Sequence, residues 1–230
     1  MLGRENFAFP VRWDDEGWPE FGERGRLPER SITAGVDTHF VDDFSKKEWP
    51  FSWNFLRNPE ADHYHREEGR LLLDGSADQL SGEGAPTWLG VRQRDHRSRC
   101  RADVEFRFDG EGDAGLTLFQ NRDYHVCFGV KQGGDGRKGF VRIRLGELVW
   151  LDEFPPPPQR LALEIRSHDA KYELGWRWSE NKWKFLRSVD ARILSREFGG
   201  RFTGVYYALY AEGAARLKCT RFAYEPASGR

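Results

Sequence analysis

The alternation of apolar and charged residues is clearest between Arg99 and Phe108. One face carries only small and apolar side chains, and the other carries Arg99, Arg101, Asp103, Glu105 and Arg107. A period of two residues predicts an antiparallel β-strand with one face in a core and its charged face in water.

Shorter segments of the same kind follow along the chain. They span residues 114–120, 124–130, 139–145, 161–166 and 172–178, and turn residues such as Asp109-Gly110 and Gly133-Gly134-Asp135-Gly136 separate them. Such spacing predicts an all-β fold, an antiparallel β-sandwich of jelly-roll type. The only helix we expect is a turn or two at residues 190–195.

The stretch from Phe202 to Tyr210 is apolar or aromatic on both faces. It predicts a strand in the middle of the stack, with one face on a second sheet and the other lining a groove or meeting another surface. Farther on, Leu217 and Cys219 have one parity and Phe222 and Tyr224 the other, which predicts a bulge near Thr220 and Arg221. The prolines at 155–158 predict a stiff connector between strands.

Charge and composition exclude several classes of protein. The 230 residues contain 36 Lys and Arg against 37 Asp and Glu, so a nucleic-acid-binding surface or a polybasic membrane anchor is not expected. Neither a run of transmembrane length nor a signal peptide is recognisable in the sequence, which predicts a cytoplasmic location. Cys100 and Cys127 lie inside strand patterns and are interpreted as small buried hydrophobes.

Aromatic residues are unusually frequent, with 9 Trp and 17 Phe. They suit β structure and also sugar recognition, because an indole can stack on the apolar face of a pyranose. Residues 1–35 contain Trp13, Trp18 and Phe21 without a regular period. We expect this segment to pack against the sandwich or against a neighbouring domain.

A saccharide site is predicted around Trp88, with hydrogen-bond donors from Arg92 and Gln93 close by in the sequence. Neighbouring strands add Arg57, Tyr207 and Phe202. The same residues would also suit an interface with another domain, and that alternative stays open. By parity, Trp176 and Trp178 are interpreted as core residues rather than as a binding platform.

The candidates for catalysis and metal binding are weak. Asp103 and Glu105 share a face with arginines and are interpreted as a solvated charge ladder. His63 and His65 lack a third metal ligand nearby. No cofactor is expected, although a structural calcium ion at Asp37, Asp42 and Asp43 is an open alternative.

Five short motifs in a fixed order carry a resemblance to a known family. They are Trp53-Asn54-Phe55-Leu56-Arg57-Asn58-Pro59, Gly69-Arg70-Leu71-Leu72-Leu73, Val91-Arg92-Gln93, Ala114-Gly115-Leu116 and Gly199-Gly200-Arg201-Phe202-Thr203-Gly204. Residues 36–226 resemble the C-terminal concanavalin A-like domain of glycoside hydrolase family 43 β-xylosidases and arabinofuranosidases. Residues 1–35, with Leu2-Gly3-Arg4-Glu5 and Gly17-Trp18-Pro19, resemble the last segment of that family's catalytic propeller plus a linker, and residues 227–230 are expected to be a disordered end.

The resemblance implies a function. In the family, a propeller that would precede Met1 carries the catalytic carboxylates, so no catalytic residue is expected in this chain. The first hypothesis is an accessory sandwich that binds xylan-type saccharide, buttresses the propeller, or both. The alternative is the C-terminal part of a split or truncated hydrolase that is active only with a propeller partner, and a self-contained jelly-roll glycosidase is the weakest option. Expected partners are a xylan-type saccharide, a catalytic propeller and further copies of the chain.

Overall fold

A computed structural model describes residues 2, 11–21, 38–168, 170–179, 182–200 and 202–227. The chain forms two compact units, one from Arg4 to Asp37 and one from the first three residues together with residues 38–230. The smaller unit contains an antiparallel hairpin of β1 (Val11–Trp13) and β2 (Pro19–Phe21). Asp14 closes its turn by accepting hydrogen bonds from the N–H groups of Glu16 and Trp18 (3.0 and 2.8 Å).

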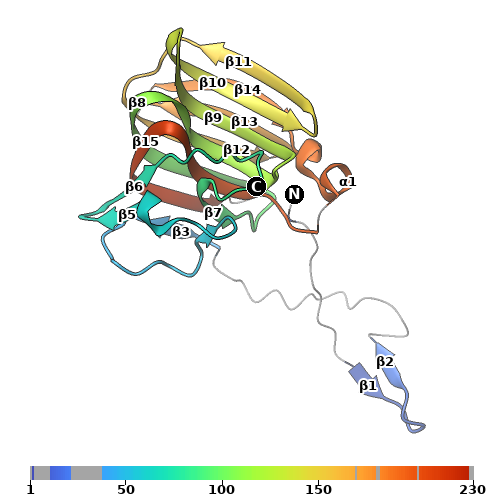
Figure 1. Cartoon of the computed structure of the whole chain (residues 1–230). Coiled ribbons are helices and arrows are strands. Elements are labelled where there is room, and N and C mark those ends of the chain that lie inside the picture. The colour runs from blue at the N-terminus through green and yellow to red at the C-terminus, as the bar shows by residue number, and fades with distance from the viewer. Residues whose placement is uncertain are drawn as a thin grey trace. The chain divides into compact units, whose positions relative to one another are not determined.

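The larger unit is a sandwich of two antiparallel layers, which share the long strands β8 (Ser98–Asn121) and β15 (Tyr206–Pro226) (Figure 1). The first layer runs in the order β11 (Leu148–Phe154), β10 (Gly136–Leu145), β9 (Tyr124–Gly133), the second half of β8, the first half of β15, β7 (Thr87–Arg92) and β4 (Asn54–Phe55). The second layer runs β14 (Trp183–Asp190), β13 (Lys171–Arg177), β12 (Arg160–His168), the first half of β8, the second half of β15, β6 (Arg70–Asp74) and β5 (Tyr64–Glu67), with β3 (Phe40–Asp42) on the end of β15. The predicted all-β antiparallel fold is confirmed.

β8 and β15 turn together from one layer into the other. The sequence predicts two strands at 99–108 and 114–120, but they are one continuous strand, paired with β15 on both sides of the corner. Glycine makes the corner possible, because a Cβ on Gly112 would lie 2.3 Å from the Glu212 carbonyl oxygen and Gly213 has a φ of 64°.

The core lies between the layers. Inward-facing side chains come from both, including Leu116, Phe128 and Leu209 of the first layer and Ile165, Trp176 and Leu217 of the second. Alternation along each strand places these residues inside and the intervening residues outside. The cysteines Cys100, Cys127 and Cys219 are buried and unpaired, as predicted for the first two.

Several local predictions can be compared with the structure. The register of β15 shifts between Cys219 and Arg221, which confirms the predicted bulge, and residues 155–158 connect β11 to β12 outside any strand. The expected helical turn is a 3₁₀ turn at Ala191–Leu194, followed by the short helix α1 (Arg196–Gly199), and a further 3₁₀ turn lies at Ala61–His63. The strand predicted from Phe202 begins only at Tyr206, so Phe202 belongs to the preceding loop. In the described part of the chain no helix has the length and apolar character needed to cross a membrane.

Candidate functional site

The prediction that Trp88 presents an open stacking face is wrong. Its side chain is 2 % exposed and lies on the outer face of the first layer, against Phe119 and Tyr206 (ring centroids 5.5 and 5.6 Å away). Leu80 completes this second apolar cluster from the loop between β6 and β7. That loop, residues 75–86, is called here the covering segment. Local parity identifies the outward-facing residues of β7 but does not show that another segment packs on them.

Gln93 and Tyr207 are also buried, and their side chains form hydrogen bonds inside the domain. The Gln93 side chain accepts a hydrogen bond from the Tyr172 hydroxyl (2.7 Å) and donates to the Asp95 carbonyl (2.9 Å). The Tyr207 hydroxyl bonds to that of Ser98 (3.0 Å) between the layers. β7 and β15 are neighbours as predicted, but Trp88 and Tyr207 point to opposite faces of that pair.

The remaining three predicted residues lie at separate places. The Arg57 guanidinium donates to the carbonyls of Gly84 and Gly82 (2.7 Å for the latter) and so holds the covering segment. Arg92 is half-buried and donates to the Leu2 carbonyl (3.1 Å). Phe202 is exposed. The six residues therefore do not form one open groove, and saccharide binding by the exposed members stays a prediction.

A polar cluster that the sequence did not reveal lies under the covering segment. Asp113 of β8 and Glu212 of β15 are direct cross-strand partners, and both accept hydrogen bonds from Arg142 of β10 (2.8 and 3.1 Å). The Tyr210 hydroxyl donates to Asp113 Oδ1 (2.7 Å), and the Leu80 N–H donates to Glu212 Oε1 (2.6 Å). These hydrogen bonds occupy both oxygens of each carboxylate.

Burial controls the electrostatics of this cluster. Desolvation and then the adjacent Asp113 carboxylate raise the pKa of Glu212, against the opposing effect of Arg142. His125 lines a cavity of about 130 Å³ together with Asp113, Arg142 and Glu212. Desolvation and then the charge of Arg142 lower the pKa of His125 to about 3. Although the two carboxylates are paired, their oxygens are engaged and covered, so the arrangement anchors the covering segment and does not present an open acid and base.

Sequence spacing alone does not find this pair. Asp113 and Glu212 come together only because β8 and β15 pair in one particular register. The available signal is Glu212, a single acidic residue after an apolar strand segment, since buried strand positions rarely carry a charge without a partner.

The candidate metal ligands have other partners. Asp42 accepts hydrogen bonds from Arg66 (2.7 and 2.8 Å), the Trp53 indole (2.7 Å) and the Phe44 N–H (2.8 Å), which occupies both of its oxygens. Asp43 bonds to Ser45, and Asp37 lies outside the described residues. His63 contacts Thr87, and His65 contacts Asp74. Within the described ranges, no group of three or more His, Cys, Asp or Glu is placed to hold a metal ion.

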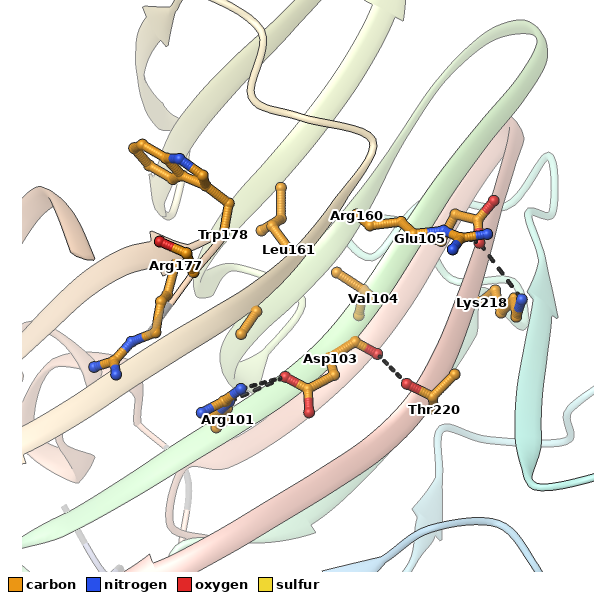
Figure 2. A pocket seen from close by; sticks show the side chains of 12 residues that line it. Arg101, Asp103, Val104, Glu105, Arg160, Leu161, Arg177, Trp178, Lys218 and Thr220 are labelled. Carbon is orange, nitrogen blue, oxygen red and sulfur yellow. Dashed lines mark hydrogen bonds and ion pairs between the residues drawn. The ribbon is translucent and has the colours of Figure 1, made fainter. Parts of the chain in front are cut away.

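A trough of about 550 Å³ lies on the outer face of the second layer (Figure 2). β8 contributes Arg101, Asp103 and Glu105, and other strands contribute Arg160, Arg177 and Lys218. Glu105 is not the solvated ladder residue that the alternation predicted, because it is 7 % exposed and contacts Arg160 (3.1 Å) and Lys218 (3.4 Å). Burial raises the pKa of Glu105, but the charges of Arg160 and Lys218 outweigh burial and lower it overall.

Trp178 also lines the trough, and the prediction that it belongs to the core is wrong. β13 ends at Arg177, one residue earlier, so the alternation that buries Trp176 no longer applies. Trp178 is 41 % exposed, whereas Trp176 is 1 % exposed.

The helix α1 and the loop that follows it present two further exposed rings, Phe198 of α1 and Phe202 of the loop. Two amide side chains hold α1 at its ends, since Gln120 donates to the Ser195 carbonyl and Asn121 to the Gly199 carbonyl (both 3.2 Å). A Cβ on Gly199 would lie 1.7 Å from Gln120 Oε1, so any other residue there would have to displace the Gln120 amide.

Taken together, the two antiparallel layers and their shared long strands define a concanavalin A-like sandwich. The chain belongs to the family described as the beta xylosidase C-terminal concanavalin A-like domain, which matches residues 41–224.

The similar proteins are considerably longer than this chain. It is 28 % identical to the non-reducing end alpha-L-arabinofuranosidase BoGH43B of Bacteroides ovatus over 225 residues, which cover 92 % of this chain and 42 % of that protein. It is also 28 % identical to a xylosidase/arabinosidase of Butyrivibrio fibrisolvens, over 91 % of this chain and 43 % of the relative. The solved structure of the Bacteroides ovatus xyloglucan PUL GH43B matches with a TM-score of 0.82 at 25 % identity, over 98 % of this chain and 48 % of that one. The chain thus corresponds to the C-terminal β-sandwich of glycoside hydrolase family 43 enzymes and spans less than half of these relatives.

Proposed function

We propose that this chain is the accessory sandwich of a β-xylosidase or arabinofuranosidase of family 43, and that it supports a catalytic propeller. Hydrolysis then requires the propeller, whether it is in the same polypeptide or in a partner. The names of the relatives suggest xyloside and arabinofuranoside substrates.

The observation that carries this proposal is the pair of exposed rings Phe198, on α1, and Phe202, on the loop that follows it. Exposed aromatic rings are suited to packing against another surface, and Gln120 and Asn121 hold the helix of Phe198 at both ends, so that little conformational entropy is lost when this ring docks. From the family resemblance we expect the equivalent loop to lie at the mouth of the active site of the propeller and to donate an aromatic side chain there. Arg201 stands where an aromatic residue is often found, and we assign that role to the neighbouring Phe202. The burial of Trp88 and Tyr207 also favours support of a propeller over saccharide binding at the predicted groove.

The test is hydrolysis of aryl β-xylosides and aryl α-L-arabinofuranosides by three samples. These are the chain alone, a family 43 propeller alone, and the two mixed or co-expressed. We expect no turnover by the chain alone and higher kcat/KM for the mixture than for the propeller alone.

Variants of exposed phenylalanines sharpen this test. Phe202→Ala should remove most of the gain, whereas Phe51→Ala, at a fully exposed position on another loop, should leave it unchanged. Turnover by the chain alone that is abolished by Glu212→Gln would overturn the proposal in favour of a self-contained glycosidase. A mixture no more active than the propeller alone would overturn the supporting role.

A further inference from the structure

The trough on the outer face of the second layer combines an exposed indole with an excess of cations. Its charged lining consists of Arg101, Arg160, Arg177 and Lys218 against Asp103 and Glu105. This local excess contrasts with a formal net charge of −1 for the chain, so the positive charge is concentrated at this place.

The trough is extended by a neighbouring hollow. A second hollow of about 180 Å³ shares Arg101, Asp103 and Arg177 with it and continues along the strands toward Arg221 and Glu225. In Figure 2, Trp178 and Arg177 stand on one side, and Glu105 and Lys218 on the other. Leu161 and Ala162 of β12 supply apolar surface between them.

The cations keep donors for a ligand. Arg160 is 77 % exposed and donates its Nε–H to Glu105, and within the described residues its two Nη groups have no protein partner. Lys218 contacts Glu105 at 3.4 Å, longer than a strong charge-assisted bond, and Arg107 approaches the same carboxylate at 3.7 Å, so three cations share Glu105. A planar guanidinium with free N–H groups matches a carboxylate, and an indole matches the apolar face of a sugar.

We propose that this trough binds xylan-type oligosaccharides that carry uronic acid side groups. Trp178 stacks on a sugar ring, and Arg160, with Lys218 and Arg101, pairs with the uronate carboxylate. The choice of a xylan backbone rests on the proposed function above. The choice of an acidic substituent rests on the lining of the trough itself.

The test measures retardation of the chain in affinity gels that contain glucuronoxylan, the same polymer after chemical reduction of its carboxyl groups, or polyglutamate. We expect retardation by glucuronoxylan, a several-fold weaker effect with the reduced polymer, and little with polyglutamate. Higher salt should weaken the effect because these charges are exposed.

Matched variants locate the site. Trp178→Ala should weaken binding by about three- to tenfold, and Arg160→Gln by about two- to fivefold. Trp150→Ala removes a similarly exposed indole on β11, and Arg122→Gln removes a remote exposed cation, so both should bind like the parent.

Equal retardation by the reduced polymer would overturn the acidic-sugar assignment, and equal retardation by polyglutamate would show simple polyanion binding and overturn it as well. Absence of retardation, or retardation unchanged in both trough variants, would overturn the site. These measurements use the chain alone, so they can fail while the hydrolysis test of the proposed function succeeds, and the reverse also holds.

Discussion

The Glu212 carboxylate accepts a hydrogen bond from the backbone N–H of Leu80 (2.6 Å), a residue 132 positions earlier in the chain. This contact fixes the covering segment to β15. The same carboxylate lies beside Asp113, and Arg142 holds the two together. The covering segment is therefore anchored through a buried ionic cluster whose single shared cation is the critical element.

Removal of that cation is expected to destabilise the domain strongly. Arg142→Met leaves the buried Glu212 and the partly buried Asp113 side by side without their shared partner, which should lower the free energy of unfolding by about 2–4 kcal/mol at pH 7. Burial and Asp113 already raise the pKa of Glu212, and loss of the guanidinium raises it further. The deficit of the variant relative to the parent should therefore shrink as the pH falls and Glu212 takes up a proton, in addition to the acid sensitivity that His125 gives to both proteins. Urea denaturation at pH 7 and pH 5 measures both effects.

Arg144→Met is the matched control, because Arg144 lines the same cavity but donates to the Gly146 carbonyl at the end of its own strand. It should cost less than about 1 kcal/mol. Equal losses for the two variants would contradict the assigned role of Arg142.

His125 is expected to make the domain sensitive to mild acid. Burial and then the Arg142 charge lower its pKa to about 3, whereas an unfolded histidine titrates near 6.5. The unfolded state therefore binds a proton first, and stability is lost as the pH falls below about 6.5. Between pH 6.5 and 5 this loss amounts to about 1.5 kcal/mol.

His125→Asn should remove this part of the pH dependence while it keeps a donor for the Asn121 carbonyl. The quantity to compare is the slope of unfolding free energy against pH, not its absolute value. His96→Asn, at an exposed position, should retain the parental slope. A slope in His125→Asn as steep as that of the parent would show that other groups cause the acid sensitivity.

Local patterns predicted the strands better than they predicted the surfaces. Alternation located the strand segments at 99–108 and 114–120, and a parity change located the bulge before Arg221. Both are local properties of the chain. The same parity argument failed for Trp178, because it cannot tell that β13 ends one residue earlier.

The candidate site was less predictable because it depends on distant contacts. Trp88 is covered by a segment that packs on its strand from outside the sheet, and Asp113 meets Glu212 only through the register of β8 with β15. Neither relationship has a signature in the local sequence. Arg57 was expected to join Trp88 from a neighbouring strand, but it uses its donors on the carbonyls of Gly82 and Gly84.

Asp42 is expected to contribute stability through Arg66, whose side chain is 4 % exposed. Burial raises the pKa of Asp42, but hydrogen bonds from Arg66 and Trp53 outweigh burial and lower it overall. This contribution to stability is therefore fully present at pH values above 3.8, the ordinary pKa of an aspartate. It is lost as the pH falls through the lower pKa that Asp42 has in the folded state. At pH 7, Asp42→Asn should cost about 3–5 kcal/mol, because it leaves the Arg66 charge buried and unpaired.

Asp43→Asn is the control for this change, since the adjacent carboxylate is exposed and bonds only to Ser45 within the described residues. It should cost under about 1 kcal/mol. Chemical denaturation at pH 7 compares the two variants. A loss in Asp43→Asn as large as that in Asp42→Asn would contradict the importance of the buried ion pair.

Trp88→Ala tests the corrected position of this residue. Because Trp88 fills the cluster beneath Leu80, its truncation should leave a cavity and lower the free energy of unfolding by about 3–5 kcal/mol. Trp178→Ala should cost under about 1 kcal/mol, because that side chain is exposed.

The buried Trp88 Nε1–H has no hydrogen-bond acceptor in the described part of the chain, so Trp88→Phe removes an unsatisfied donor together with some volume and should cost about 1–2 kcal/mol. Denaturant unfolding of the three variants should therefore rank them Trp88→Ala, Trp88→Phe and Trp178→Ala in order of decreasing loss. If Trp88→Ala were as stable as the parent but no longer bound xylan, the original prediction of an open stacking platform at Trp88 would be the correct one.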